Sequence, residues 1–266
     1  MPALSWVTDI HFNFISAVEQ LDFCQKIQQE NSSGVLVGGD IGEALSICNY
    51  LTMMAEIISK PIYFVLGNHD FYHGSIGRVR ENVRKLVCRY PHLHFLPDKN
   101  PIELSSVTVL LGCTAWADGR NGDFFLSPVR LNDFTLISEL QELEPVLLYN
   151  RLNMLGDDDA VLLDGVLPGV MQKYREVIIL THVPPFDKAC WHEGNVANSD
   201  YLPHFSNSGV GQVIVKVLDN HSNCSIRLFC GHTHSPGVVQ IRPNLEVITG
   251  GAKYYQPELQ TPVEFR

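Results

Sequence analysis

The chain lacks any apolar run that approaches the ~20 residues needed for a membrane-spanning helix, so we expect no membrane span. It also offers little room for a leader peptide, because an apolar run begins at Leu4 and a polar Asp-x-His motif starts at Asp9. A basic segment, an apolar core and a cleavage site do not fit before that run. We therefore expect no secretory signal in this sequence.

Basic residues are scarce: 19 Lys and Arg stand against 29 Asp and Glu, for a formal charge of −10. This balance argues against an extended nucleic-acid surface. The dense basic stretch 78–89 alternates with apolar residues at helical spacing, which predicts a helix with a solvated basic face. The seven cysteines form no C-x-x-C pair and several lie in apolar runs, which favours reduced thiols and a cytoplasmic protein.

With 266 residues, 45% of them hydrophobic, the chain is long enough for one large α/β domain. Repeats, low-complexity tracts and linker-like stretches are absent from the sequence. We predict a single domain over residues 1–266.

Five short apolar runs, at 4–7, 35–37, 62–66, 177–180 and 226–230, are each followed closely by a polar motif. Their length and β-branched or aromatic content predict buried strands. The motifs are Asp9-Ile-His11, Gly39-Asp40, Gly67-Asn-His-Asp70, Thr181-His182 and Gly231-His-Thr-His234. Because open α/β sheets bind ligands beyond the carboxyl ends of their strands, we expect these side chains to gather at one edge.

Helical patterns lie between the early strands. Ser16 and Glu19 form a capping-box pattern, and a second amphipathic helix over 45–58 ends before Pro61. This alternation predicts parallel strands. Farther along, 237–241 and 245–248 predict a hairpin, and 146–174 predicts a helix in two pieces around Gly156. The two halves predict two mixed β-sheets packed face to face with helices outside.

The motif order D-x-H, G-D, G-N-H-D, H and G-H-x-H resembles the calcineurin-like metallophosphoesterase superfamily, from Asp9 to His234. Gly112-Cys-Thr-Ala-Trp116 and Leu131-Asn-Asp-Phe134 are similar to segments of a bacterial subgroup of that superfamily. The resemblance implies the same α/β fold, a four-layer α/β/β/α sandwich. It also implies two divalent transition metals, and Mn, Fe or Zn suits a mixed oxygen and imidazole ligand set.

The resemblance also implies which residues bind each metal. Asp9, His11 and His234 hold the first, Asn68, His182 and His232 hold the second, and Asp40 bridges the two. A shared carboxylate offsets the repulsion between cations about 3.5–4 Å apart. We expect Asp9 and His11 to share one face of an extended segment, as do His232 and His234, because side chains two residues apart do so.

The role of His69 follows from the same resemblance, and those of the other polar residues follow from their positions in the sequence. His69 would steady the phosphoryl oxygen and protonate the leaving group, with Glu43 as the acidic partner that aims its ring. Arg120 and Arg130 are candidates for substrate binding beside Asn68, with salt-bridged surface arginines as the alternative. Asp70 is expected to accept backbone hydrogen bonds at its turn.

We expect His192 and His204 to face solvent, the alternative being the pocket mouth.

The predicted activity is hydrolysis of a small, nucleotide-like phosphodiester or phosphomonoester by a metal-bound hydroxide. Phosphoprotein phosphatases of the superfamily carry a substrate-clamping Arg where this chain has Ala44, and Glu where it has Asp70. Both differences argue against that branch. A repair-type nuclease, which would need a basic extension, and a non-enzymatic scaffold, which would be expected to have lost ligands, remain alternatives. The oligomeric state stays open.

Overall fold

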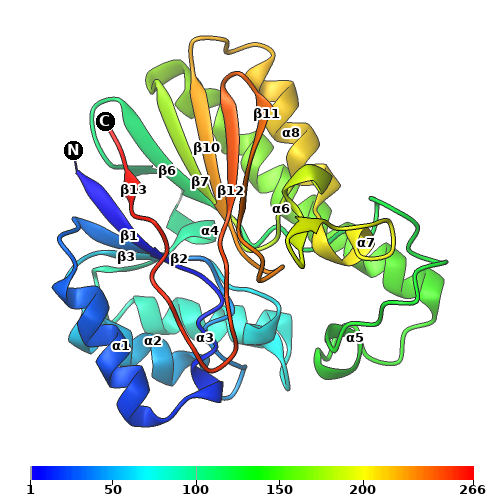
Figure 1. Cartoon of the computed structure of the whole chain (residues 1–266), viewed down its shortest axis with the longest axis horizontal. Coiled ribbons are helices and arrows are strands. Elements are labelled where there is room, and N and C mark those ends of the chain that lie inside the picture. Colours follow the sequence, from blue (N-terminus) through cyan, green and yellow to red (C-terminus); the bar gives the residue numbers. More distant parts are fainter. Residues whose placement is uncertain (1, 100) are drawn as a thin grey trace.

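A computed structural model of the chain describes residues 2–99 and 101–266 and contains two large mixed β-sheets (Figure 1). The first sheet has the strand order β13 (Val263–Glu264), β1 (Ala3–Val7), β2 (Gly34–Val37), β3 (Ile62–Phe64), β4 (Leu93–Phe95). The second has the order β11 (Gly237–Arg242), β12 (Leu245–Thr249), β10 (Ser225–Cys230), β7 (Glu176–Leu180), β6 (Thr108–Gly112), β5 (Ile102–Glu103). Neighbouring strands pair in parallel except at β13, β11 and β5, which lie at sheet edges.

Helices cover the outer face of each sheet (Figure 1). The first sheet is covered by α1 (Ala17–Gln29), α2 (Ile47–Ile57) and α3 (Ile76–Val87), and the second by α6 (Pro145–Lys173) and α8 (Ser208–Leu218). The shorter elements are η1 (Phe12–Phe14), η2 (His69–Phe71), α4 (Leu96–Lys99), α5 (Asp133–Leu136), η3 (Asp187–Ala189), β8 (Trp191–His192), β9 (Asn195–Val196) and α7 (Leu202–Phe205). The predicted arrangement of two mixed sheets between helices is confirmed.

A separate apolar layer lies between the two sheets. Trp6 of β1 contacts Phe229 of β10 edge to face, with ring centroids 5.1 Å apart. Leu36 of β2 and Ile178 of β7 are fully buried in the same layer. Because both faces of the central strands are covered, these strands consist almost entirely of apolar residues.

Local sequence accounts for several boundaries. The Ser16 hydroxyl accepts from the Glu19 amide while the Glu19 carboxylate accepts from the Ser16 amide, so the predicted capping box begins α1. The predicted hairpin is formed by β11 and β12. Helix α3 buries Val79 and Val83, leaves Arg78, Arg84 and Lys85 exposed and half-buries Arg80.

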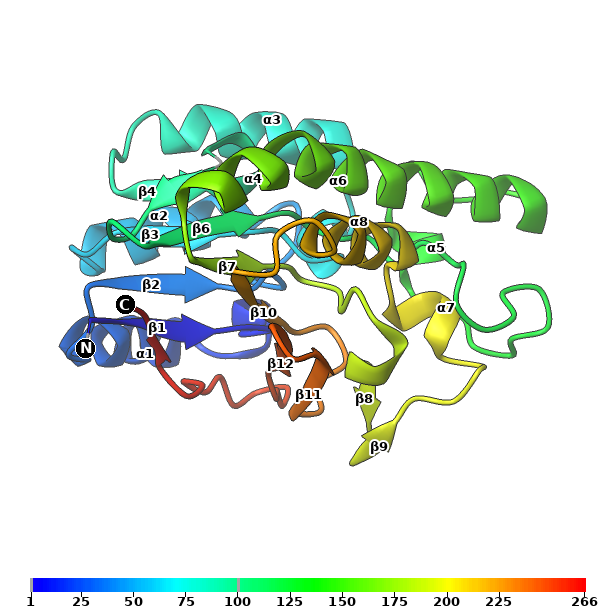
Figure 2. The ribbon, with the colours of Figure 1, turned by 90° about the horizontal axis from the view of Figure 1, so that it is seen from above.

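The prediction of two helical pieces over 146–174 was wrong, because α6 runs unbroken for 29 residues (Figure 2). Gly156 does not end the helix. A Cβ atom there would lie 2.7 Å from the Cβ of Asp118, so the glycine lets α6 pack closely on the loop after β6. Tertiary packing therefore explains this glycine.

The connections that follow the strands gather at one end of the molecule. The segments with α5, α7 and the β8–β9 hairpin lie beyond the carboxyl ends of β1, β2 and β6 (Figure 2). Among the described helices, none combines the length and apolar character of a membrane-spanning segment.

Candidate metal centre

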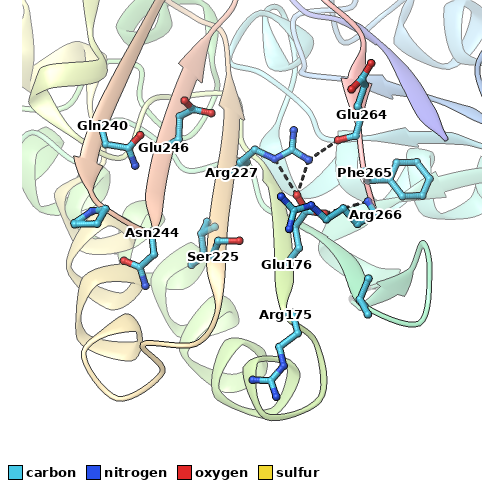
Figure 3. Close-up of a pocket in the computed structure, with 13 residues that line it drawn as sticks. Arg175, Glu176, Ser225, Arg227, Gln240, Asn244, Glu246, Glu264, Phe265 and Arg266 are labelled. Carbon is cyan, nitrogen blue, oxygen red and sulfur yellow. Dashed lines mark hydrogen bonds and ion pairs between the residues drawn. The ribbon is translucent and has the colours of Figure 1, made fainter. Parts of the chain in front are cut away.

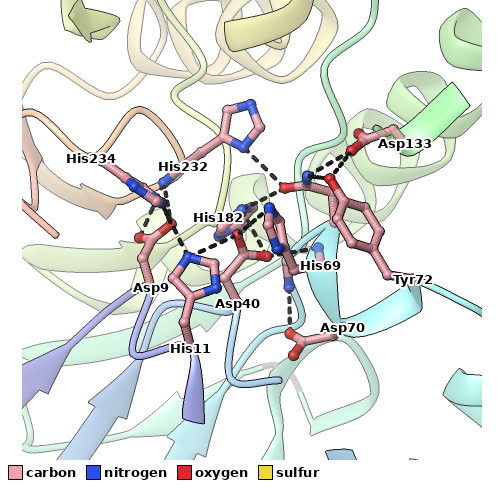
Figure 4. A network of polar contacts seen from close by, with 12 residues as sticks. Asp9, His11, Asp40, His69, Asp70, Tyr72, Asp133, His182, His232 and His234 are labelled. Carbon is pink, nitrogen blue, oxygen red and sulfur yellow. Dashed lines mark hydrogen bonds and ion pairs between the residues drawn. The ribbon is translucent and has the colours of Figure 1, made fainter. Parts of the chain in front are cut away.

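The seven predicted ligand residues lie together at the carboxyl edge of the two sheets (Figure 4). Asp9, His11, Asp40 and Asn68 follow strands of the first sheet, whereas His182, His232 and His234 follow β7 and β10 of the second. The site therefore forms where the two sheets meet, as expected for the carboxyl ends of neighbouring parallel strands.

One group of ligand atoms comes from Asp9, His11, Asp40 and His234, whose atoms all lie within 4.8 Å of one another. The Nε2 atoms of His11 and His234 are 3.1 Å apart. Nε2 of His234 lies 3.3 Å from Oδ1 of Asp9, and Nε2 of His11 lies 3.8 Å from Oδ2 of Asp40. Imidazole nitrogens and carboxylate oxygens in this number suit a divalent transition metal.

A second group surrounds Asn68. Its Oδ1 lies 3.0 Å from Nε2 of His182 and 3.0 Å from Nδ1 of His232. Oδ1 of Asp40 lies 3.4 Å from Nε2 of His182, while its Oδ2 faces His11. The two oxygens of Asp40 thus face different groups, the arrangement that a bridging carboxylate requires.

Backbone carbonyl groups fix the tautomers of both histidines beside Asn68. Nδ1 of His182 lies 2.8 Å from the carbonyl oxygen of Gly38, and Nε2 of His232 lies 2.9 Å from that of His204. A carbonyl oxygen only accepts, so these ring nitrogens carry the protons. The opposite nitrogens therefore direct lone pairs toward Asn68, and such orientation by a neighbouring carbonyl is typical of metal-binding histidines.

These lone pairs also test whether a cation fits. Three acceptors, Oδ1 of Asn68 and the two ring nitrogens, converge with no proton between them. Asp40 adds a buried carboxyl, whose pKa is raised well above its usual value by burial and by the neighbouring Asp9 and Asp70. Converging acceptors and buried acids are stabilised by a positive charge, so the residues fit the metals that the motif pattern implies.

The lowered pKa values of the ligands His11 and His232 agree with this interpretation, and that of His234 is the exception. Burial, followed by neighbouring histidines, lowers the pKa of His69 to about 2. Burial likewise lowers the pKa of His11 to about 3 against the charge of Asp9, and that of His232 to about 3. Unprotonated rings keep the lone pairs that metal binding needs. Against the effect of burial, the hydrogen bond with Asp9 raises the pKa of His234.

The backbone differs from the expected extended segments. Asp9, His11, Asp40, His232 and His234 all have positive φ, between 43° and 69°. The prediction that each pair shares one face of an extended segment was therefore wrong, because the strands end before these residues and the chain turns through left-handed conformations. Such conformations are costly for residues other than glycine and cluster at functional sites.

The motif glycines allow the close approach of these turns. A Cβ at Gly67 would lie 2.1 Å from Oδ1 of Asp40, and one at Gly231 would lie 2.0 Å from Oδ2 of Asp9. Any side chain at either position would displace a carboxylate of the site.

Asp70 has the structural role that the sequence predicts, which is confirmed. Its Oδ1 accepts from the amides of Ile41 and Gly42 at 2.8 Å, and its Oδ2 accepts from that of Gly67 at 2.9 Å. The carboxylate thereby fixes the loops that carry Asp40 and Asn68 against each other.

His69 borders the same site without a place in either ligand group. Its Nε2 is 3.9 Å from Oδ2 of Asp40, and its ring stacks on Tyr72 with centroids 4.2 Å apart. Glu43, its predicted acidic partner, instead accepts a hydrogen bond from Asn13 at 3.2 Å. The structure therefore brings His69 to the site and turns the Glu43 carboxylate to another residue.

A cleft of about 360 Å³ opens onto both groups. Its walls include Tyr72, Arg130, Phe205 and Tyr254. Tyr254, from the segment after β12, packs against His11 and His234 with centroids 4.7 and 5.0 Å away. Its position depends on a tertiary approach that no sequence motif signals.

The other polar residues that the sequence singles out differ in whether they lie at the cleft. Arg130 lines the cleft, whereas Arg120 is ion-paired with Asp118 at 3.1 Å and Asp157 at 2.7 Å. The salt-bridge alternative thus describes Arg120. His192 lines the cleft, and His204 is 1% exposed, so the expectation that both face solvent was wrong.

Sequence reasoning gave no site role to Asp133 and Tyr72, whose side chains hydrogen-bond to each other beside Asn68 (Figure 4). The sequence of the Asn-Asp-Phe segment indicates a family likeness and no site role. The spacing of Tyr72 four residues after Asn68 is the one local signal for its position, because η2 turns both to the same side.

A larger cavity, about 420 Å³, lies at the opposite end of the second sheet, beside the first residues of β7 and β10 (Figure 3). There Arg227 donates to Glu176 at 2.7 Å and to the carbonyl oxygen of Glu264. Arg227 and Glu176 form an ion pair in its wall, and the candidate ligands lie at the other ends of the strands.

The sequence pattern of the calcineurin-like phosphoesterase family matches residues 6–236. The chain belongs to this family, and the family together with the Asp and His cluster supports metal-dependent phosphoester hydrolysis through a dinuclear centre. A comparison with curated proteins found no match.

Solved structures with the same fold include the phosphopantetheinyl hydrolase PptH from Mycobacterium tuberculosis, with a TM-score of 0.67 and 11% identity over 94% of this chain and 89% of that one. A dimetal phosphatase from Danio rerio has a TM-score of 0.55 and 16% identity over 94% and 87%. The protein TT1561 of Thermus thermophilus has a TM-score of 0.52 and 11% identity over 94% and 89%. At these identities the likeness establishes the fold.

Proposed function

We propose that this protein hydrolyses a small, nucleotide-like phosphoester, a diester in preference to a monoester, with two divalent transition metals. The proposal is supported above all by the position of Asp40 between the two ligand groups: its Oδ1 faces His182 and its Oδ2 faces His11. A carboxylate shared between two ligand groups at the base of an open cleft is the arrangement used for phosphoester displacement at two metals.

The first metal would be held by Asp9, His11, Asp40 and His234, and the second by Asp40, Asn68, His182 and His232. When bound, the metals lower the pKa of water and polarise the phosphoryl group. Mn, Fe and Zn all suit this ligand set.

The protein's own residues supply orientation and a proton. His69 reaches the cleft, its side chain is 15% exposed, and Tyr72 supports one face of its ring. From there we assign it the proton for the leaving oxygen. Because burial lowers the pKa of His69 to about 2 and the Glu43 carboxylate accepts a hydrogen bond from Asn13, the negative charge of the bound phosphoester, in place of Glu43, would have to keep the ring protonated.

The cleft favours a small substrate of low charge. Among the described residues that line it, Arg130 carries the permanent positive charge, while Tyr72, Phe205 and Tyr254 provide aromatic surface. A diester with one negative charge needs less neutralisation than a monoester with two. The volume of the cleft, about 360 Å³, is within the range of small-molecule sites.

The two alternatives lack comparable support. A repair-type nuclease needs basic surface, whereas this chain has a net charge of −10. A non-enzymatic scaffold has no need of His69 or of a complete ligand set, and both are present here. The cysteine pattern favours the cytoplasm as the place of action.

The decisive test compares kcat/KM for bis-nitrophenyl phosphate, nitrophenyl phosphate and a phosphopeptide under one set of Mn²⁺ and pH conditions. We expect the diester to be cleaved best. A kcat/KM for the phosphopeptide ten times that for the diester would indicate a phosphoprotein phosphatase. Absence of turnover with all three esters would favour a non-enzymatic scaffold.

A further inference from the structure

The orientation of the Asn68 amide decides whether the second ligand group can bind a metal. An asparagine side chain presents an acceptor oxygen at one end and a donor NH₂ group at the other. The lone pairs of His182 and His232 face this side chain at 3.0 Å, so only the oxygen end completes a set of metal ligands. The NH₂ group of Asn68 therefore needs a hydrogen-bond acceptor on the side away from the two histidines.

Asp133 provides that contact. Nδ2 of Asn68 donates to Oδ1 of Asp133 at 2.8 Å. The hydroxyl of Tyr72 donates to the same oxygen at 2.7 Å, and Nδ2 of Asn68 also lies 3.3 Å from that hydroxyl. Oδ1 of Asp133 thus accepts two hydrogen bonds. The bond from Asn68 keeps the NH₂ group of that side chain pointing away from the two histidines.

The contact is well placed to be rigid. Asp133 is 5% exposed and Tyr72 is 4% exposed, so water competes weakly for either group. Asp133 is the first residue of α5, which follows a long excursion from β6, and it meets Asn68 across 65 residues of chain. The excursion therefore contributes one buried acceptor directly behind a candidate metal ligand (Figure 4).

We propose that Asp133 is a positioning residue for the second metal: it fixes the Asn68 amide with its oxygen toward His182 and His232, and so sets the affinity of that site alone. The proposal rests on the two-metal site of the proposed function. Asp9, His11 and His234, the ligands of the first group that the second does not share, belong to other loops, so the first site is expected to be insensitive to Asp133.

The test is calorimetric titration of the metal-free protein with Mn²⁺, together with the EPR spectrum of the loaded protein. Asp133→Ala should weaken the second binding step about 10- to 100-fold, as expected for loss of a partner that orients a ligand, and leave the first step within about threefold. The loaded wild type should give the EPR spectrum of a coupled Mn²⁺ pair. Asp133→Ala should give that of a single ion, because it holds one equivalent of Mn²⁺.

Two variants separate orientation from general packing. Asp133→Asn keeps an oxygen acceptor in the same place and should recover most of the second-step affinity. Tyr72→Phe removes the other donor and leaves the contact between Asp133 and Asn68, so it should bind both metals nearly as the wild type does. If Asp133→Ala does not fold, Asp133→Ser, whose hydroxyl is too short to reach the amide, replaces it with the same expectations.

The proposal is overturned if a folded Asp133→Ala variant binds both Mn²⁺ ions with wild-type affinity, or if both steps weaken equally. Its failure is distinct from failure of the proposed function. A wild-type protein that binds two Mn²⁺ ions and cleaves no phosphoester would refute the function and leave the role of Asp133 in metal binding intact.

Discussion

The Nε2 atoms of His11 and His234 lie 3.1 Å apart, although 223 residues separate them in the chain. Asp9 and Asp40 place carboxylate oxygens around the same two nitrogens. Nδ1 of His11 is buried and has no hydrogen-bond partner among the described residues, so within them this ring lacks a second contact of the kind that fixes His182. A cation would satisfy all four side chains at once.

We therefore expect two divalent metals per chain. Metal analysis of protein reconstituted with excess Mn²⁺ and then desalted should give a ratio of two, because each ligand group binds one ion and Asp40 is shared. His234→Ala should reduce the ratio to one by removing a ligand of the first group. A wild-type ratio at or below one would contradict the two-metal site.

His69→Ala should keep both metals and lose turnover by ~10²–10⁴-fold, the usual contribution of a general acid. The loss should be smallest for nitrophenolate leaving groups, which hardly need a proton. Parallel kinetics with an alkyl ester test this directly. Equal losses for good and poor leaving groups would assign His69 to phosphate binding instead.

The two candidate arginines should behave differently. Arg120→Ala leaves Asp118, which is fully buried, without its ion-pair partner. We expect a loss of about 2 kcal/mol, below the ~3–5 kcal/mol of a fully buried pair because a quarter of Arg120 is exposed. Thermal unfolding should show this as a drop of several degrees.

Arg130→Ala should instead raise KM and leave the unfolding temperature nearly unchanged, since Arg130 is exposed and donates to the carbonyl oxygens of Ser127 and Val129 in its own loop, at 2.7 and 2.8 Å. Reversed behaviour of the two variants would show that the cleft is not the binding surface.

His204 should make the fold sensitive to acid. Burial, then the charge of Arg130, lowers the pKa of His204 from 6.5 to about 4. The folded protein therefore holds His204 in its neutral form more strongly than the unfolded chain does. This contribution to the free energy of unfolding is fully present above pH 6.5 and is lost as the pH falls toward 4. Between pH 7 and 5 this amounts to about 1–2 kcal/mol.

Denaturant unfolding of the wild type and of His204→Gln at both pH values tests the effect. The variant should lose less stability on acidification, because glutamine gains no charge. His73→Gln, at a solvent-exposed position, is the matched control and should follow the wild type. If His204→Gln follows it as well, another group governs the acid response.

The sequence predicts those parts of the fold that depend on local pattern. The strands before Asp9, Asp40, Asn68, His182 and His232, the capping box of α1 and the β11–β12 hairpin all follow from apolar runs and turn chemistry. The gathering of the ligands also follows, because parallel strands bring their carboxyl ends to a common edge.

What the sequence could not predict depends on contacts between distant segments. A glycine within a helical pattern predicts a break at Gly156, but the residue is there because α6 packs closely against Asp118, a contact set by tertiary packing. The family resemblance predicts Glu43 beside His69, yet its carboxylate accepts a hydrogen bond from Asn13. Asp133 and Tyr254 reach the site from long excursions whose paths no periodicity specifies.

Each ligand group joins the first sheet to the second. His11 and His234 are 223 residues apart in the sequence, and Asn68 and His232 are 164 residues apart, so a bound ion at either group acts as a cross-link that closes a long loop. Such a link reduces the entropy of the unfolded chain as a disulfide does, and the reduction grows with loop length. Metal supply would then govern the lifetime of the protein against proteases as well as its activity, since the metal-free form loses both cross-links together.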